Sequence, residues 1–494
     1  MVWLRTAPEP ASDDGPDSEL HCPLEWCRGH RPSVPVVGMH ELDAENEDLV
    51  RRVLDYALDQ LGSDPPLDGP RSAGELQALV GETITATGLG GAEALRRFAD
   101  HLAPACIPTD HPRYLAFVSG APTMAASAFD LVVGSQSLCG STWLDGAGMV
   151  FAENQALRWI ADLAGLPDSA GGCFVTGGTM GNLSALVTAR HDADRKRAAA
   201  GMGRPDRWAV VAAKSAHSSI DSAARVMDVE VILAGIDDDQ RLRGDAVAEA
   251  ISGRPAGTEV FAVAATAGTT NLGIVDAIDG IADACAASSV WLHVDGAYGG
   301  AAMAAPSVRH RFDGIEHCDS LVVDPHKWLF SPFDCAALLY RNPPLAREAH
   351  TQHAGYLEPI IDDTVWNPCD YANVLTRRAR GMPFWFSLAV YGTDAYRDAI
   401  EHTLEVARAA RDLVVAAEHL ELLVEPELSV VAFRRRGWEL ADYQAWCDRL
   451  LDDGTAMLTP TTFDGGAAMR ICVVNPRTTV EDLEEILATL DPVA

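Results

Sequence analysis

The sequence has little positive charge and no long apolar runs. Its 494 residues carry 38 Lys and Arg against 71 Asp and Glu, a formal net charge of −33. Non-specific binding to nucleic acids or anionic membranes requires basic surfaces, so we expect neither as a partner, and any anionic ligand must be held by a local positive site. No uninterrupted apolar run approaches the roughly 20 residues that span a bilayer. The first twenty residues are polar and acidic, so we expect no secretory signal.

Cysteine is present, but without the density of a disulfide framework. The 11 cysteines are odd in number and scattered from Cys22 to Cys472, which favours a reducing, cytoplasmic location. Near the N-terminus, Cys22, Cys27, His30 and His40 have a spacing that loosely resembles a zinc knuckle. We favour incidental thiols in a tail over a metal site.

The composition is globular, and the hydrophobic pattern divides the chain into four segments. Apolar residues make up 48% of the sequence, and the length suits two to three domains. Residues 1–38, rich in Pro, Asp and Ser, are expected to be a loosely ordered tail, and residues 39–114 an N-terminal helical segment. Residues 115–390 are expected to form a large domain, and residues 391–494 a smaller α+β domain.

The large segment has the pattern of an α/β fold. Short runs rich in Val, Ala and Ile, such as GGCFVTGG, RWAVVAAK and VWLHVDGAYGG, alternate with helix-like stretches. These runs show no in/out alternation, so the strands are buried on both faces and the sheet is mostly parallel. Flanking helices are expected over residues 41–62, 91–104, 398–419 and 479–491.

Two charged residues end apolar strands. Lys327 follows the run LVV in Asp-Pro-His-Lys-Trp, where it is either a snorkelling lysine or a lysine with a lowered pKa that forms a Schiff base. Asp295 in HVDGAY is either a helix N-cap or a carboxylate in the ligand-binding crevice at the carboxyl edge of the sheet. A pyridoxal phosphate ring needs such a carboxylate to keep its pyridine nitrogen protonated, and the small Ala297 could lie flat under the ring.

Three further motifs are expected at the same edge. The Gly-rich turn 176–182 leads from a strand into a helix, whose N-terminal N–H groups suit a phosphate, although most such turns are only turns. It is neither a Walker P-loop nor GxGxxG, which weighs against nucleotides. His217 precedes a helix and could stack on a cofactor ring, although a lone His is usually structural. The run 267–270 supplies the hydroxyl of Thr270.

Together these motifs resemble the group II pyridoxal-phosphate-dependent decarboxylases. The segments HSS, VDGAY, DPHKW and NPRTT occur in the order and spacing of that family, and the likeness runs from His111 to Thr479. It implies the large PLP fold type I, an N-terminal segment used in a homodimer, and decarboxylation of an L-amino acid to an amine and CO₂. The family includes aromatic-L-amino-acid, glutamate, histidine and diaminobutyrate decarboxylases.

The resemblance also implies a cofactor site. Its members are Gly178, Thr179, His217, Thr270, Asp295, Ala297, Asp324, His326 and Lys327. Lys327 would form the Schiff base with pyridoxal 5′-phosphate, Asp295 would pair with the pyridine nitrogen, and His217 would stack on the ring. Gly178 and Thr179 would hold the phosphate. A carboxylate nearby, at position 324, would repel a phosphate unless it contacts only N–H or hydroxyl donors.

The resemblance implies a proton donor and substrate contacts as well. Tyr356, reached from Lys327 without a gap, matches a loop tyrosine that protonates Cα after CO₂ leaves, although it could be only a surface residue. Arg377 matches an arginine that can approach a substrate carboxylate or phosphate, and Phe117 and His326 would line the substrate side. No second basic cluster stands near Phe117, so we favour an aromatic or bulky apolar amino acid over a dicarboxylic one.

Other readings of the same motifs give different outcomes. One is a PLP-dependent aldehyde synthase, in which decarboxylation is followed by oxidative deamination. Another is an aminotransferase-like enzyme of the same fold. A third is a catalytically inactive scaffold that only binds a partner, against which the intact Lys327, Asp295 and His217 argue.

Overall fold

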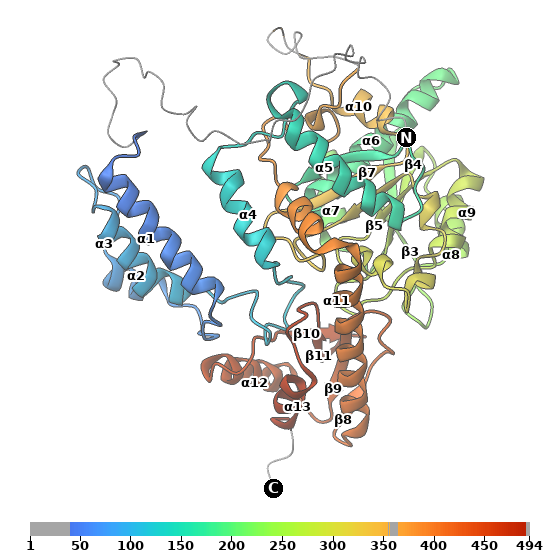
Figure 1. The fold of residues 1–494 in the computed structure, drawn as a ribbon. Helices are drawn as coiled ribbons and strands as arrows, with labels where there is room; N and C mark the ends of the chain where they lie inside the picture. Colours follow the sequence, from blue (N-terminus) through green and yellow to red (C-terminus); the bar gives the residue numbers. More distant parts are fainter. Residues whose placement is uncertain (1–39, 354, 356–363, 491–494) are drawn as a thin grey trace, which may run out of the picture. The chain divides into compact units, whose positions relative to one another are not determined.

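The computed structural model describes residues 40–353, 355 and 364–490 (Figure 1). The chain divides into two compact units. Of the described residues, the first unit comprises 40–65 and 70–106, and the second comprises 66–69, 107–353, 355 and 364–490.

The first unit is helical. Its helices are α1 (Ala44–Leu61), α2 (Ala73–Val80) and α3 (Gly91–Arg97), and α3 continues as a π-helical turn (Phe98–Leu102) and a 3₁₀ turn (Ala103–Ala105). The helices begin where side chains cap them: Asp43 accepts from the N–H of Asn46, and Ser72 and Glu75 form a capping box. Helix α1 buries none of its own residues. On its apolar side, Leu49 and Leu54 are half-buried, whereas Val53 and Leu61 are exposed.

The second unit contains a seven-stranded sheet in the order β1-β7-β6-β5-β4-β2-β3. Its strands are β1 (Gly171–Val175), β2 (Arg207–Ala213), β3 (Glu230–Ala234), β4 (Thr258–Thr266), β5 (Trp291–Asp295), β6 (Ser320–Val323) and β7 (Ala336–Tyr340). Strands β2 to β6 pair in parallel, whereas β7 runs antiparallel to β1 and β6. The expected α/β class is confirmed.

Helices flank this sheet, and both of its faces are buried. They are α5 (Trp143–Leu163), α6 (Gly178–Ala199), α7 (Ser218–Met227), α8 (Gly244–Ser252), α9 (Ile278–Ser288) and α10 (Pro343–His350). Helix α4 (Met124–Ser135) packs instead against the long helix α11 (Met382–Ala416). Alternate residues of β2 and β4 belong to two separate hydrophobic clusters. That alternation explains why the strands read as continuous apolar runs in the sequence.

A smaller four-stranded antiparallel sheet, in the order β10-β11-β9-β8, follows in the sequence. It consists of β8 (Leu420–Leu422), β9 (Val430–Arg435), β10 (Pro460–Phe463) and β11 (Gly466–Cys472), with helices α12 (Leu440–Asp452) and α13 (Val480–Ala488). The long helix α11 (Met382–Ala416) leads into it and is broken at Gly392, where φ is +76°. The expected domain boundary at residue 390 lies beside this break. Among the residues described, no helix is both long and apolar enough to cross a membrane.

Candidate active site

A cavity of about 270 Å³ lies at the carboxyl edge of the parallel strands, next to the N-termini of α6 and α7. Its lining includes all nine residues of the expected cofactor site: Gly178, Thr179, His217, Thr270, Asp295, Ala297, Asp324, His326 and Lys327. Asn182, Tyr298 and Phe333 also line it, and the sequence analysis did not single them out. Five separate motifs thus converge on one crevice, as the parallel topology requires.

Lys327 lies inside a negatively charged part of this cavity. Its Nζ is 3.0 Å from Asp324 Oδ2. Burial acts to lower the pKa of Lys327, but the carboxylates of Asp324 and Asp295 outweigh it, so the pKa is raised above its ordinary value. The lowered pKa expected from the sequence is therefore wrong for the protein without ligand, because that expectation counted burial and not the two carboxylates.

Asp324 holds the start of α6 as well as Lys327. Its Oδ2 accepts a hydrogen bond of 3.2 Å from the N–H of Gly178. A Cβ on Gly178 would lie 3.1 Å from Ala297 Cβ and 3.2 Å from Asp324 Oδ2, so this turn needs glycine for close approach. Asp324 Oδ1 is buried without a hydrogen-bond partner. The carboxylate therefore contacts donors and leaves one acceptor atom for a ligand.

Asp295 is a buried carboxylate that forms no ion pair within 4 Å among the described residues, although the charge of Lys327 acts on it from further away. Its Oδ2 accepts from Asn182 Nδ2 at 2.8 Å, and its Oδ1 accepts from the N–H of Ala297 at 3.1 Å. The neighbouring His217 is the N-cap of α7, where its Nδ1 accepts from the N–H of Ser219 at 3.2 Å. The imidazole is thereby fixed against the wall of the cavity.

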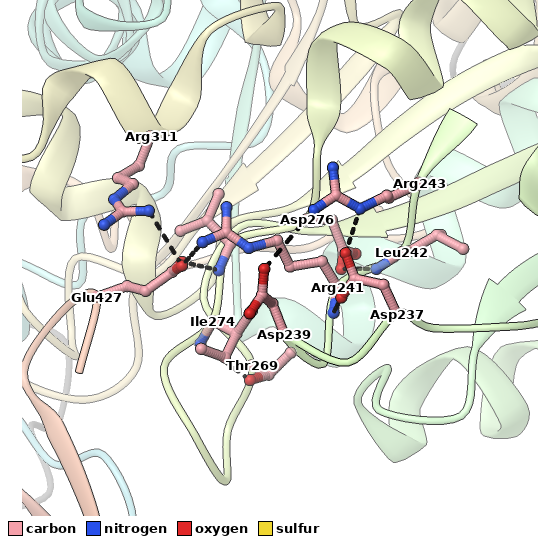
Figure 2. Close-up of polar contacts among 11 residues, drawn as sticks. Asp237, Asp239, Arg241, Leu242, Arg243, Thr269, Ile274, Asp276, Arg311 and Glu427 are labelled. Carbon is pink, nitrogen blue, oxygen red and sulfur yellow. Dashed lines mark hydrogen bonds and ion pairs between the residues drawn. The ribbon is translucent and has the colours of Figure 1, made fainter. Parts of the chain in front are cut away.

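Thr270 lines the cavity from the loop that follows β4, and two buried carboxylates hold this loop in place. Figure 2 shows their contacts, together with the neighbouring Thr269. Glu427 accepts from the N–H of Val275 at 2.9 Å and forms ion pairs with Arg241 and Arg311. Asp276 accepts from the N–H groups of Leu242 and Thr266, at 2.9 and 2.7 Å. These two buried carboxylates hold both ends of the loop that places Thr270 in the cavity.

Arg377 does not line the cavity, so the structure does not support its expected contact with substrate. The side chain is 3% exposed and forms a bidentate ion pair with Glu153, at 2.8 and 2.9 Å. It also donates to the backbone oxygens of Phe174 and Gly140. These partners occupy the guanidinium, which stabilises the packing of α5 against the segment before α11.

Phe117 contacts Arg470, a buried arginine that the sequence analysis missed. Phe117 itself has φ of +51° and is half exposed, and its backbone oxygen accepts from the guanidinium of Arg470 on β11. Arg470 is 4% exposed, has no carboxylate partner among the described residues, and its Nε has no hydrogen-bond partner. Its only sequence signal is one charge inside the apolar strand AAMRICVV.

The segment that contains Phe117 also reaches Lys327. A Cβ on Gly120 would lie 1.6 Å from the backbone oxygen of Lys327, so Gly120 packs directly on the lysine's main chain. The same segment pairs with β11 through the N–H of Cys472, which donates to the oxygen of Leu115. Residues 115–120 therefore contact both the guanidinium of Arg470 and the main chain of Lys327.

Several predicted residues lie outside the described part of the chain. They are Tyr356 and three residues of the possible zinc knuckle, Cys22, Cys27 and His30. His40 is described and exposed. Within the described residues, no group of three or more His, Cys, Asp or Glu side chains is arranged to hold a metal ion.

Comparison with known proteins identifies the family. Residues 90–436 match the pyridoxal-dependent decarboxylase conserved domain. An aromatic-L-amino-acid decarboxylase from Bacillus atrophaeus is 32% identical over 78% of this chain and 82% of its own length. An L-2,4-diaminobutyrate decarboxylase from Rhizobium meliloti is 31% identical over 90% of each chain. The crystal structure of Oryza sativa TDC with PLP and tryptamine matches 91% of this chain and 97% of its own, with 26% identity and a TM-score of 0.84.

The residues of the cavity fit the cofactor of this family. The turn at Gly178 offers helix N–H groups for a phosphate, and the carboxylate of Asp295 lines the same cavity as the lysine that would carry the cofactor. Asp324 contacts the donors Lys327 Nζ and Gly178 N–H, as a carboxylate beside a phosphate must, and Gly178 closely approaches Ala297. On the matched domain, the related sequences and this site, the chain belongs to the pyridoxal-dependent decarboxylases, carboxy-lyases of PLP fold type I whose cofactor is pyridoxal 5′-phosphate.

Proposed function

We propose that this chain decarboxylates an L-amino acid to the corresponding amine and CO₂. The observation that carries the proposal is the buried carboxylate of Asp295, which has only neutral hydrogen-bond partners and lies in the same cavity as Lys327. Bound pyridoxal phosphate supplies an electron sink for the negative charge left at Cα. A negative side chain beside the ring nitrogen keeps that sink protonated.

Other residues of the cavity have supporting roles in this proposal. Lys327 Nζ would make the covalent link to the cofactor, and His217 and Ala297 would contact its ring. The N-terminus of α6, with Gly178 and Thr179, would hold the phosphate, and Thr270 would add a hydroxyl contact. His326 faces the substrate side, where its ring packs at 5.0 Å from that of Phe333.

We assign recognition of the substrate carboxylate to Arg470 in place of Arg377. Arg470 does not line the cavity either, but it is a buried guanidinium without a carboxylate partner among the described residues. It donates to the backbone oxygen of Phe117, in the segment 115–120 that packs on Lys327. Lys327 is the one cation among the Lys and Arg side chains of the cavity lining, and Phe333 and the nearby Phe117 are partly exposed. This supports an aromatic or bulky apolar side chain rather than a second carboxylate.

A panel of L-amino acids tests both the reaction and the substrate class. Each is incubated with the holoenzyme, and products are identified by mass spectrometry together with CO₂ release. Amine and CO₂ from an aromatic amino acid support the proposal. Aldehyde, ammonia and peroxide would identify an aldehyde synthase, and a keto acid an aminotransferase-like enzyme.

We further propose Tyr356 as the donor of the proton to Cα. Its position in the sequence supports this, 29 residues after Lys327 in a segment outside the described residues. A tyrosine on a loop can close over a site and deliver a proton while excluding water. Tyr356→Phe should still release CO₂ but yield aldehyde in place of amine, whereas unchanged amine formation would leave Tyr356 as a loop residue only.

We also propose that the protein is a homodimer and cytoplasmic. Apolar side chains are exposed on α1 of the first unit (Val50, Val53, Leu58) and, in the second unit, on α4 and α5 (Leu131, Phe151). Such surfaces are typical of an interface. The nine cysteines among the described residues are free thiols, as expected in a reducing compartment. Light scattering of the purified protein tests the dimer, and a monomer at micromolar concentration would contradict it.

A further inference from the structure

A buried chain of hydrogen bonds between neutral side chains ends on Asp295. Trp291, His293 and Asp295 alternate along β5, so all three face the same side of the sheet as α6. Ser320, the first residue of β6, lies opposite His293 in the sheet register. Asn182 projects from α6 between His293 and Asp295.

The direction of each hydrogen bond follows from the Asp295 end of the chain. A carboxylate can only accept, so Asn182 turns its NH₂ toward Asp295 and its Oδ1 toward His293 Nε2, which must donate to it, at 2.9 Å. In the neutral imidazole Nδ1 is then the acceptor, so it accepts from the Ser320 hydroxyl at 2.9 Å, and Ser320 Oγ in turn accepts from Trp291 Nε1 at 2.8 Å. Asn182 Nδ2 donates to Asp295 Oδ2 at 2.8 Å.

The amide of Asn182 is locked in one orientation. Rotating it by half a turn would place its oxygen against the carboxylate of Asp295 and its NH₂ against the N–H of His293. Its second amide hydrogen is used by Ser219 Oγ, at 2.8 Å. Asn182 is 1% exposed, and His293 and Ser320 are fully buried, so water cannot replace a lost partner.

The same hydrogen-bond chain adds no positive charge to the site. Burial lowers the pKa of His293 to about 4, although the carboxylate of Asp295 acts in the opposite direction. The imidazole is thus neutral at neutral pH. It orients Asn182 without neutralising Asp295.

We propose that Asn182, held by His293, is a positioning residue that aims the Asp295 carboxylate at the ring nitrogen of the cofactor. The inference rests on the proposed function for the role of Asp295. The hydrogen-bond chain itself is a property of the protein without cofactor, so the two can be tested separately.

The first test needs no cofactor. In ¹⁵N-histidine-labelled apoprotein, with His293→Gln to assign the signal, NMR should show the His293 proton on Nε2. Asn182→Leu removes the acceptor, so the proton should move toward Nδ1, where Ser320 Oγ can accept it. Thr188→Val is the matched control, because it removes another buried hydrogen-bonding group from α6 that contacts Tyr340 and not this chain. A wild-type proton on Nδ1, or no change in Asn182→Leu, would overturn the proposal.

The second test measures the affinity of apoprotein for pyridoxal 5′-phosphate. Asn182→Leu should weaken it by about 10- to 100-fold, the usual cost of losing a hydrogen bond to a charged group. His293→Leu should act in the same direction, and His293→Gln should restore most of the loss because a carboxamide donates and accepts like neutral imidazole.

A double-mutant cycle separates positioning from general destabilisation. If Asn182 acts through Asp295, then Asn182→Leu should add little to Asp295→Asn, whereas the small effect of Thr188→Val should simply add to it. Additive losses for Asn182 and Asp295 would overturn the proposal. If wild-type protein bound no cofactor, the proposed function would fail, and the tautomer of His293 in the apoprotein would still decide the hydrogen-bond chain.

Discussion

Two buried carboxylates near the large sheet have different electrostatic surroundings. Glu427, 8% exposed, is neutralised by Arg241 and Arg311 and accepts a backbone N–H from Val275 (Figure 2). Asp295, 5% exposed, receives only the neutral donors of Asn182 and Ala297. The structural carboxylate forms direct ion pairs within the protein, whereas the cavity carboxylate forms none among the described residues and has only the more distant charge of Lys327.

Two buried arginines repeat the contrast. Arg377 is paired with Glu153 through two hydrogen bonds, whereas Arg470 has no carboxylate partner among the described residues. Its guanidinium donates to the oxygen of Phe117 and lies near the thiol of Cys472, and its Nε is unpartnered. Burying an uncompensated charge costs stability, so such groups are selected for something other than folding. Their missing partner is expected to be a ligand, which makes charge compensation a way to separate site residues from structural ones.

The largest expected effect is that of Lys327→Ala. Losing the residue that links the cofactor should reduce turnover by about a thousandfold or more and abolish the absorbance of covalently bound cofactor. The chain has only three lysines, at positions 196, 214 and 327, so borohydride trapping followed by peptide mapping identifies the linked one without ambiguity. Lys196→Ala, which removes an exposed partner of Asp192, is the control and should remain active. Trapping on Lys196 or Lys214 would refute the assignment.

Next comes a direct comparison of the two carboxylates. Asp295→Asn should retain some cofactor but lose at least about a hundredfold in kcat, because an amide cannot stabilise the protonated ring nitrogen. Glu427→Gln should instead lower the free energy of unfolding by about 3 kcal/mol, because it leaves two arginines without their counter-ion. Urea denaturation and steady-state kinetics on both variants check this. If Asp295→Asn lost only stability, charge compensation would not mark the site.

The sequence was sufficient for the residues that follow strands. Lys327, Asp295, His217 and the turn at Gly178 each follow or end a strand of a parallel sheet, and such ends must meet at one edge. The antiparallel strand β7 and the helices α4 and α5 were not identified, because CAALLY and the residues 124–163 resemble any buried segment.

The roles of the two arginines could not be read from the sequence. Arg377 lies in a family motif, but its role depends on Glu153, which is 224 positions away and paired only in the fold. Arg470 stands alone in an apolar strand, and only burial without a partner distinguishes it. The direction of the pKa shift of Lys327 was predicted wrongly for the same reason, because the carboxylates of Asp324 and Asp295 act on it through space.

The arginines give a smaller, more selective prediction. Arg470→Gln should raise KM for the amino acid by about 10- to 100-fold, the cost of a charge-assisted hydrogen bond, with a lesser change in kcat. Arg377→Gln leaves the buried Glu153 unpaired and should destabilise the fold by about 3–5 kcal/mol, while KM of the folded enzyme is unchanged. Kinetics at several substrate concentrations separate the two. An unchanged KM in Arg470→Gln would mean that Arg470 does not bind the substrate carboxylate, and His326 would be the next candidate.

The last comparison concerns the neutral hydrogen-bond chain, whose effect on stability appears only in acid. In the unfolded chain His293 takes up a proton near pH 6.5, whereas in the fold it does so near pH 4. Between these pH values the unfolded state binds more protons, so the free energy of unfolding falls as the pH falls. The contribution of neutral His293 to that free energy is complete above pH 6.5 and is lost as the pH falls through 4. The loss amounts to roughly 3 kcal/mol for a shift of this size.

His293→Gln keeps one donor and one acceptor but cannot titrate, so its unfolding free energy should fall less steeply than that of wild type between pH 6.5 and 4. Burial also lowers the pKa of His326 and His350, but their contributions cancel when variant and wild type are compared. The exposed His310→Gln is the matched control and should follow wild type. Urea denaturation of the apoproteins at pH 7, 6, 5 and 4 measures the difference. Parallel curves for wild type and His293→Gln would mean that His293 is not held neutral, and then Asp295 would have a cationic neighbour after all.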